Sequence, residues 1–287
     1  MADTATLQFT VDDYKSSEKP TWCPGCGDFG VLNALYHAMR EKNYNPKDVV
    51  LVSGIGCSSR LPFFVATYGF HGVHGRAMPI ATGVKVARPD LHVLVLGGDG
   101  DAFAIGGGHF MHAARRNLNV TYVIMDNQTY GLTKGQASPT AQRGYVHKAA
   151  PKGTLEEPVN PLLLAMACGA SFVARGFSGQ PKDLAQLILA GIEHQGLAII
   201  DTYSPCPTFN KVNTFKTYRE EVAPLPPDHD PTNFEAALKI AASPMPRYLG
   251  VIYRREGPSY EQLLEQRKTG TEADLPQLLD SLFDRFS

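Results

Sequence analysis

Short runs of apolar residues, each ending at glycine or an acidic residue, recur along the first part of the chain. One run covers residues 93–96 and stops at Gly97, and another covers residues 120–125 and stops at Asp126. Uninterrupted apolar runs of this length are typical of parallel strands that are buried on both faces. Residues 102–117, between the two runs, repeat their apolar side chains about one helical turn apart. The pattern predicts a strand, a helix and a strand, joined by the right-handed connection that such units almost always adopt.

Comparable patterns predict further elements on both sides of this unit. Strands are expected at residues 49–52, 172–174 and 197–203, and helices at residues 29–39, 77–87, 161–168 and 181–194. This alternation of strands and helices predicts an α/β fold. Residues 128–161 show no regular pattern, and an irregular segment of that length inside a compact domain is usually functional. Residues 224–232 read as a linker that leads into a mixed helical tail.

The composition is that of a globular protein. Of the 287 residues, 43% are hydrophobic and 19% are charged, so the chain can bury a full core. A net charge of -1 and a pI near 6.7 leave no basic surface for nucleic acid, which is therefore not an expected partner. No apolar run reaches the roughly 18 to 20 residues of a membrane span. Residues 1–20 form a polar leader without the features of a secretion signal, and we expect a cytoplasmic protein.

Glycines and hard oxygen donors follow the two strands of the central unit. Gly98, Asp99 and Gly100 come after the first strand, and Asn127 follows the second, 28 residues beyond Asp99. Carboxyl ends of parallel strands meet at the edge of the sheet where α/β proteins bind ligands. Carboxylate and amide oxygens suit Mg²⁺, which can bridge a diphosphate, and glycines let the backbone approach it closely. A dinucleotide site is disfavoured because the third glycine of its fingerprint would fall at Phe103.

Four of the five cysteines lie in loops rich in glycine and proline, namely Cys23, Cys26, Cys57 and Cys206. Cys57 and Cys206 follow predicted strands, so the fold can bring them to the edge of the sheet that carries the diphosphate residues. Cys168 lies instead in an apolar helical segment, where a free cysteine behaves as a small hydrophobic residue. Four thiolates satisfy either a tetrahedral Zn²⁺ ion or a [4Fe-4S] cluster. A thioredoxin-like pair would leave Cys57 and Cys206 unexplained.

Six motifs, taken in order, resemble the β subunit of the 2-oxoacid:ferredoxin oxidoreductases. They are WCPGCG at 22–27, GIGCSS at 54–59, HGRA at 74–77, GGDGDAFAIGG at 97–107, DNQTYGLTKGQASPT at 126–140 and SPCPTF at 204–209. The resemblance implies a thiamine diphosphate-binding fold, which is a doubly wound, mostly parallel sheet with helices on both faces. It also implies a domain for thiamine diphosphate and a [4Fe-4S] cluster over residues 21–210, followed by a C-terminal extension over residues 211–287.

The resemblance also implies a role for each matching residue. Asp99, Asn127 and the main-chain carbonyl of Thr129 would hold Mg²⁺ on the diphosphate, and the four loop cysteines would bind the [4Fe-4S] cluster. His74 in HGRA would lie close to the cofactor and is a candidate catalytic residue. The residues expected to surround the cofactor are Gly56, Cys57, Ser58, His74, Gly75, Gly98, Asp99, Gly100, Asp101, Asn127, Thr129, Tyr130, Gly131, Leu132 and Thr133.

The activity implied is the oxidative decarboxylation of a 2-oxoacid, with the reverse direction open. Coenzyme A would receive the acyl group, and ferredoxin would receive electrons from the cluster. The chain would pair with an α subunit, as a heterodimer or a dimer of heterodimers. Two alternatives stay open at this point: a non-oxidative thiamine enzyme subunit with a structural zinc site, and a metal-binding scaffold without turnover.

Lys134 is a second candidate catalytic residue, because it follows the predicted Mg²⁺ residues by only a few positions. A cation in that loop is costly unless an anion meets it. We therefore expect Lys134 either to pair with the second carboxylate of a substrate, or to lie on the surface or pair with a carboxylate of the protein. The first role would favour 2-oxoglutarate over pyruvate and over branched-chain 2-oxoacids.

Overall fold

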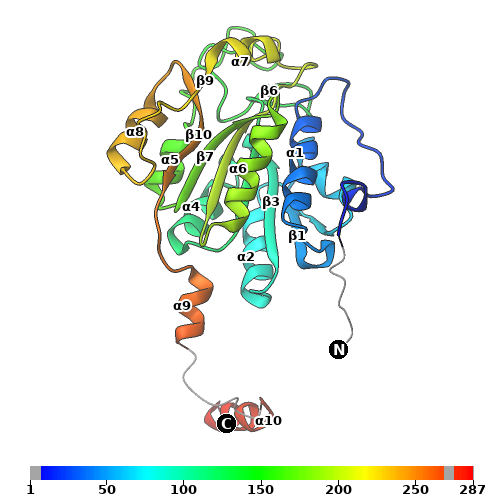
Figure 1. The fold of residues 1–287 in the computed structure, drawn as a ribbon, viewed down its shortest axis with the longest axis vertical. Coiled ribbons are helices and arrows are strands. Elements are labelled where there is room, and N and C mark those ends of the chain that lie inside the picture. The colour runs from blue at the N-terminus through cyan, green and yellow to red at the C-terminus, as the bar shows by residue number, and fades with distance from the viewer. Residues whose placement is uncertain (1–7, 268–274, 287) are drawn as a thin grey trace.

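One large sheet organises the part of the chain that the computed structural model describes, residues 8–267 and 275–286 (Figure 1). Its eight strands lie in the order β2-β1-β3-β4-β8-β7-β10-β9. The six strands from β2 to β7 are parallel to one another, and β10 runs antiparallel to β7. The strands are β1 Val49–Ser53, β2 Tyr68–His71, β3 His92–Gly98, β4 Thr121–Asp126, β7 Phe172–Phe177, β8 Ala198–Tyr203, β9 Val222–Pro224 and β10 Arg247–Arg254.

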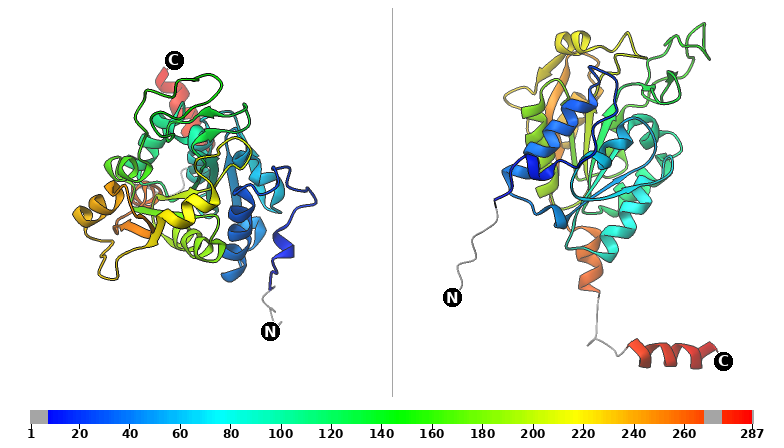
Figure 2. Two further views of the ribbon diagram at one scale, coloured as in Figure 1. Left: turned by 90° about the horizontal axis from the view of Figure 1, so that it is seen from above. Right: turned by 90° about the vertical axis from the view of Figure 1, so that its right-hand side faces the viewer.

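Helices cover both faces of this sheet (Figures 1 and 2). The helices on one face are α1 Asp28–Glu41 and α6 Pro181–Glu193. Those on the other are α2 Ala77–Ala87, α4 Gly107–Arg116, α5 Pro161–Ala167 and α8 Phe234–Ala242. Successive residues of β3 point to opposite sides, so Val93 and Val95 join one core while Leu94 and Leu96 join the other. This double burial explains the uninterrupted apolar runs, and it confirms the predicted doubly wound sheet with helices on both faces.

Shorter elements complete the described chain. They are the helices α3 Asp99–Phe103, α7 Phe215–Glu221, α9 Tyr260–Gln266 and α10 Leu275–Phe286, the strands β5 Thr129–Tyr130 and β6 Gln136–Ala137, and the 3-10 turns η1 Asp12–Tyr14, η2 Pro46–Asp48 and η3 Ser58–Phe64. Across the described residues, none of the helices combines the length and the apolar character that crossing a membrane requires.

The helix expected over residues 102–117 is in fact two helices. The first, α3, already begins at Asp99, and the chain then turns before α4 begins at Gly107. Gly106 sits in this turn, where a Cβ atom would lie 2.3 Å from the carbonyl oxygen of Asp101. Only glycine, which has no Cβ, can lie so close to that carbonyl. Because Gly106 falls within an apolar pattern of helical period, the sequence did not reveal the break between the two helices.

The C-terminal extension differs from the expected mixed helical tail. Strand β10 adds to the main sheet beside β7, and its Ile252 is fully buried in the core. Helix α8 also packs into that core through Ala237 and Ala241. Residues 222–254 therefore belong to the main fold. Strand β10 covers the edge that β7 would otherwise expose.

The strand expected at residues 172–174 extends to Phe177. Its apolar run is interrupted by Arg175, which is buried all the same and lies 3.3 Å from the carboxylate of Asp201 on β8. A buried arginine is tolerated in a strand only with such a partner, and the sequence pattern does not show which residue provides it.

His194 at the end of α6 gives a prediction about the pH dependence of stability. The residue is 8% exposed, its Nε2 lies 2.7 Å from the Ser171 hydroxyl, and burial lowers its pKa to about 4. An unfolded histidine titrates near pH 6.5, so the folded state binds the proton less well, and stability falls as the pH drops below about 6.5. We expect a loss of roughly 2 kcal/mol between pH 7 and pH 5 from this residue alone.

The His194→Gln variant can keep a hydrogen bond to Ser171 but cannot titrate. Unfolding free energies of both proteins, measured in urea at pH 7 and at pH 5, test the assignment. The variant should lose less stability on acidification than the wild type, whereas an equal loss in both would show that His194 is not the group responsible.

Candidate functional site

A cavity of about 570 Å³ lies at the carboxyl ends of β1, β3 and β4. Every residue predicted to surround the cofactor lines it except Gly75, so one space collects side chains from four separate motifs. Gly75 does not line the cavity itself. Its N–H donates a hydrogen bond, at 2.7 Å, to the carboxylate of Asp101, which does line it. Ile55 and Gln136 also line the cavity and were not predicted, although both lie inside the quoted motifs.

Asp99 is 1% exposed and faces this cavity from the start of α3. Its Oδ2 accepts hydrogen bonds from the hydroxyls of Thr140, at 2.5 Å, and Ser138. Burial raises the pKa of Asp99, and these two hydroxyl groups partly offset that effect. Ser138 and Thr140 were missed as site residues, and their position at the end of the DNQTYGLTKGQASPT motif was the only signal for them.

The Thr140 hydroxyl also lies 2.8 Å from Oδ1 of Asp126, the last residue of β4. A hydroxyl has one hydrogen to donate, so it can serve both carboxyl groups only if one of them is protonated. Burial, and then the nearby Asp99, raise the pKa of Asp126 well above its ordinary value. The raised pKa favours the proton that this arrangement needs, and Thr140 links the buried carboxyl groups of Asp99 and Asp126.

Asn127 is held by hydrogen bonds on both its side chain and its main chain. Its Oδ1 accepts the N–H of Thr129 at 3.0 Å, and its carbonyl accepts Nδ2 of Asn210 at 2.9 Å. The predicted Mg²⁺ residues Asp99, Asn127 and Thr129 thus line one cavity, and a hydrogen bond joins Thr129 to Asn127. A buried carboxylate beside an amide oxygen and a main-chain carbonyl is a donor set that fits Mg²⁺ together with an anionic ligand.

Asp101, in α3, joins the loops after β1 and β2 at the side of the cavity. Its Oδ1 accepts the N–H groups of Ile55, at 3.0 Å, and Gly75, at 2.7 Å, and it lies 3.2 Å from Nδ1 of His74. Burial raises the pKa of this carboxyl, and the N–H donors and His74 act in the opposite direction. Gly54 packs against it so closely that a Cβ there would lie 2.1 Å from Oδ2. Asp101 therefore orients His74, whose half-exposed side chain lines the cavity.

The four loop cysteines are neighbours at the same edge of the sheet. The sulfur atoms of Cys57 and Cys206 each lie 3.6 Å from the position of a Cβ on Gly131. Burial raises the pKa of the Cys57 thiol to about 11, and Asp28, Cys206 and Cys23 add to that effect. The pKa of Cys26 is also raised, first by burial and then by Asp28, with Cys206 and Cys57 contributing.

The thiols differ in their exposure, and Cys168 stands apart from them. Cys23 is exposed, while Cys26, Cys57 and Cys206 are partly buried. Cys168 caps α5 and packs against the hydrophobic core of the opposite face. In the described part of the chain, no group of three or more His, Cys, Asp and Glu side chains is already closed around the position of a single metal ion.

Lys134 does not line the cofactor cavity, although its neighbours Leu132 and Thr133 do. Its side chain is exposed, and its backbone has a φ of 84°, in the left-handed region. Lys134 is thus exposed and absent from the lining of this cavity, and its role stays a prediction.

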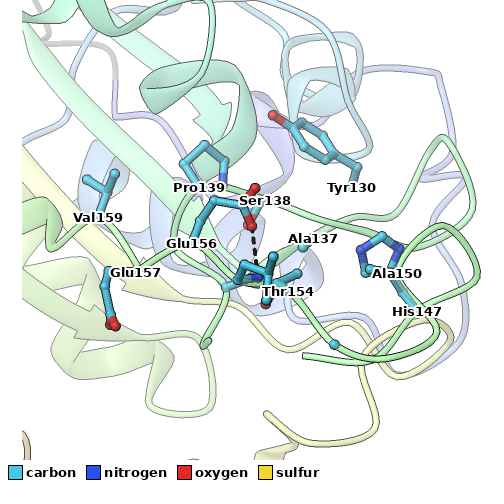
Figure 3. A pocket seen from close by; sticks show the side chains of 13 residues that line it. Tyr130, Ala137, Ser138, Pro139, His147, Ala150, Thr154, Glu156, Glu157 and Val159 are labelled. Atoms are coloured by element: carbon cyan, nitrogen blue, oxygen red, sulfur yellow. Dashed lines mark hydrogen bonds between the residues drawn. The ribbon is translucent and has the colours of Figure 1, made fainter. Parts of the chain in front are cut away.

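A second cavity of about 630 Å³ is lined by Tyr130 and by residues between 137 and 159 (Figure 3). All its lining residues lie inside the irregular segment 128–161 that was expected to be functional, and Tyr130 belongs to both cavities. Figure 3 shows Glu156 and Thr154 between His147 and Val159 along its wall. The cofactor cavity and this second cavity are thus adjacent, with Tyr130 on the wall of each.

A ligand cavity at the carboxyl ends of a doubly wound sheet, with GDG and an asparagine on its wall, defines the class of thiamine diphosphate enzymes. The family model described as "Thiamine pyrophosphate enzyme, C-terminal TPP binding domain" matches residues 52–202. A second model, which describes the C-terminal part of the β chain of pyruvate ferredoxin oxidoreductase, matches residues 206–269. Both matches agree with the predicted class.

Comparison with individual relatives narrows the class of thiamine diphosphate enzymes to one family. The 2-oxoacid:ferredoxin oxidoreductase 2, subunit beta, of Aeropyrum pernix is 42% identical over 271 residues, 90% of this chain and 88% of the relative. The 2-oxoglutarate oxidoreductase subunit KorB of Mycobacterium tuberculosis is 46% identical over 74% of this chain and 56% of its own length. The structure of 2-oxoglutarate:ferredoxin oxidoreductase from Magnetococcus marinus superposes with a TM-score of 0.92 at 46% identity, over 96% of this chain and 97% of that one.

The chain belongs to the family of 2-oxoacid:ferredoxin oxidoreductase β subunits. This confirms the resemblance drawn from the six motifs, the predicted fold and the predicted enzyme class. As a β subunit, the chain works with an α subunit. The relatives favour this oxidoreductase over both the non-oxidative thiamine enzyme and the scaffold without turnover.

Proposed function

We propose that this chain is the cofactor-binding half of a cytoplasmic enzyme that converts 2-oxoglutarate and coenzyme A to an acyl-coenzyme A and CO₂ while reducing ferredoxin. The observation that carries the proposal is that Cys57 lines the cofactor cavity and is also one of the four neighbouring thiols. A redox cluster on those thiols would lie directly beside the cofactor. Electrons released in the cavity would then have a short path out of it.

Asp99, Asn127 and the carbonyl of Thr129 would hold Mg²⁺ on the diphosphate of the cofactor. The fit rests on the burial of Asp99, which faces a cavity and lacks a charged partner among the contacts of the described residues. When bound, thiamine diphosphate supplies the carbanion chemistry that decarboxylates a 2-oxoacid. His74, oriented by Asp101, can donate or accept a hydrogen bond at the cavity wall.

Cys23, Cys26, Cys57 and Cys206 would bind a [4Fe-4S] cluster that takes electrons one at a time. Their fit rests on four thiols from three separate segments that meet beside Asp28. Asp28 is fully buried, accepts a hydrogen bond from Ser204 at 2.7 Å, and has a pKa raised by burial to about 6. Cluster binding requires these thiols to be deprotonated, and the iron would supply the positive charge that stabilises the thiolates in their partly buried positions.

Support for 2-oxoglutarate as the substrate comes from the relatives. Those of Mycobacterium tuberculosis and Methanocaldococcus jannaschii are named for 2-oxoglutarate, and the Magnetococcus marinus structure contains 2-oxoglutarate, coenzyme A and succinyl-CoA. Other relatives are named for 2-oxoacids in general. The holoenzyme is proposed to be a heterodimer or a dimer of heterodimers.

The first prediction is that the β chain alone is inactive and that the αβ enzyme prefers 2-oxoglutarate. Thiamine enzymes activate the cofactor through a carboxylate on a second domain, and the cavity described here supplies the diphosphate half only. The α subunit is expected to contribute that glutamate. Viologen reduction with 2-oxoglutarate, pyruvate and a branched-chain 2-oxoacid, measured with and without the α subunit, tests both points. Turnover by the purified β chain, or a preference for pyruvate, would contradict them.

The second prediction concerns the cysteines. Replacing Cys23, Cys26, Cys57 or Cys206 by Ser should abolish the cluster, because a [4Fe-4S] cluster uses four thiolates. The matched control is Cys168→Ser, which should retain iron and the visible absorbance that dithionite bleaches. Iron, sulfide and zinc analysis of the five variants checks the assignment. Loss of iron in Cys168→Ser, or zinc in place of iron in the wild type, would overturn it.

The third prediction concerns Asp99. Asp99→Ala should weaken Mg²⁺-dependent binding of thiamine diphosphate by roughly a hundredfold, since losing a charged ligand costs about 3 kcal/mol. Asp90→Ala, an exposed aspartate before β3, is the control and should bind normally. Titration calorimetry with and without Mg²⁺ gives both affinities. Unchanged Mg²⁺-dependent binding by the Asp99 variant would exclude this carboxylate as the ligand.

A further inference from the structure

Asp28, the first residue of α1, is a fully buried carboxyl group that acts electrostatically on Cys26 and Cys57. It does not line the cofactor cavity. An aspartate in the first turn of a helix interacts favourably with the helix dipole from the surface, whereas burying its carboxyl group costs free energy. A contribution to the helix alone therefore does not explain why Asp28 is buried.

The carboxyl group of Asp28 joins two loops that are distant in sequence. Its Oδ1 accepts a hydrogen bond at 2.7 Å from the hydroxyl of Ser204, which lies 176 residues further along the chain and is also buried. Cys26 interacts with the carboxyl group and with the main-chain N–H of Asp28, and Cys206 lies two residues after Ser204. One side-chain contact thus connects the loop of Cys23 and Cys26 to the loop of Cys206.

The backbones of these two loops meet at the same place. The N–H of Gly27 donates to the carbonyl of Pro205 at 2.9 Å, and a Cβ on Gly27 would lie 2.6 Å from the hydroxyl oxygen of Ser204. The N–H of Ser204 donates in turn to the carbonyl of Asp126, at the end of β4, at 2.9 Å. The loop of Cys206 is therefore fixed to the sheet, and the bond between Asp28 and Ser204 fixes the first loop to it.

The first loop also has a direct contact with the segment of the remaining thiol. Nε1 of Trp22, the residue before Cys23, donates to the carbonyl of Cys57 at 2.6 Å. The loop of Cys23 and Cys26 is thus held towards Cys57 by Trp22 and towards Cys206 by Asp28. Together the two contacts hold the three cysteine segments at one place, as a cluster with four thiolate ligands requires.

The bond between Asp28 and Ser204 is costly to break. Oδ2 of Asp28 is buried and has no hydrogen-bond partner in the part of the chain that the structure describes. The Ser204 hydroxyl is therefore an important source of compensation for the buried carboxyl group. Removing either partner leaves the other buried and unpaired, which costs more than the net contribution of the bond itself.

We propose that Asp28 is a positioning residue for the [4Fe-4S] cluster, and that its hydrogen bond to Ser204, which we call the loop clamp, holds Cys206 where it completes the ligand set. The proposal rests on the proposed function, because it needs a cluster on the four cysteines. Without the loop clamp, the iron bound by Cys206 is lost most easily. On oxidation, [4Fe-4S]²⁺ gives one electron to ferricyanide, and the resulting [4Fe-4S]³⁺ releases that iron as Fe²⁺ and leaves [3Fe-4S]⁺.

The test uses the αβ holoenzyme with its cluster assembled and ferricyanide as the oxidant. Asp28→Ala and Ser204→Ala each break the loop clamp, whereas Asp28→Asn keeps an acceptor for the Ser204 hydroxyl. Both alanine variants should lose the cluster roughly tenfold faster than the wild type, because a buried group is left unpaired. Asp28→Asn should lose it at the wild-type rate. The matched control is Asp183→Ala, an exposed aspartate in the first turn of α6 on the same face of the sheet, which should also behave as the wild type.

Visible absorbance gives the rate of cluster loss, and electron paramagnetic resonance detects the [3Fe-4S] product. The double variant Asp28→Ala with Ser204→Ala is an independent check. Because both changes remove the same bond, the double variant should lose its cluster no faster than the faster single variant. Thiamine diphosphate should bind all variants with wild-type affinity, since neither residue lines the cofactor cavity. If Asp28→Ala does not fold, Ser204→Ala and Asp28→Asn carry the same comparison.

Three outcomes would exclude the loop clamp and leave the proposed function intact. The first is cluster loss at the wild-type rate in both alanine variants. The second is an Asp28→Asn variant as labile as Asp28→Ala, which would assign the effect to the charge of Asp28 instead of its hydrogen bond. The third is a double variant in which the two effects multiply, which would show that the residues act independently. A wild-type enzyme that assembles no iron-sulfur cluster would instead contradict the proposed function.

Discussion

Three carboxyl groups, those of Asp99, Asp101 and Asp126, are buried at one edge of the sheet, and each must be compensated for the chain to fold. Asp101 is compensated by N–H groups from the loops after β1 and β2 and by His74. Asp126 accepts hydrogen bonds from the Thr140 hydroxyl and the Gln128 N–H. Asp99 receives hydroxyl groups and, in the proposed holoenzyme, Mg²⁺. Because these contacts draw in the loops after β1 and β2 and the segment that carries Ser138 and Thr140, compensating the carboxyl groups also assembles the wall of the cofactor cavity.

The loop over residues 129–136 separates the two halves of the proposed chemistry. Gly131 lines the cofactor cavity and packs against the sulfur atoms of Cys57 and Cys206, so the cofactor and the cluster would be separated by little more than one backbone segment. Tyr130 has a comparable position between the cofactor cavity and the second cavity, and its ring occupies the space beside Gly100 where a Cβ would lie. Glycine at positions 100 and 131 lets the cofactor cavity, the second cavity and the cysteine site lie close together.

This arrangement gives the substrate and the electrons different routes. The substrate reaction would take place in the cavity, while the electrons would leave through the sulfur atoms towards the exposed side at Cys23. Separate routes would allow an α subunit to close the cavity without blocking the proposed electron acceptor. Such a division is useful for an enzyme that must exclude water from its cofactor and still exchange electrons with a large partner.

Local features of the sequence were sufficient for the class of the fold and for most of the cavity wall. Apolar runs report burial on both faces of a strand, and a motif such as GGDGDAFAIGG keeps glycines, a carboxylate and a helix start together along the chain. Tertiary structure alone decided the contacts between distant positions, such as Thr140 with Asp99, Asp101 with Ile55 and Arg175 with Asp201. It also decided that β10 completes the sheet and that Lys134 faces solvent, because an edge partner and the direction of a turn depend on what packs nearby and leave no periodic trace in the sequence.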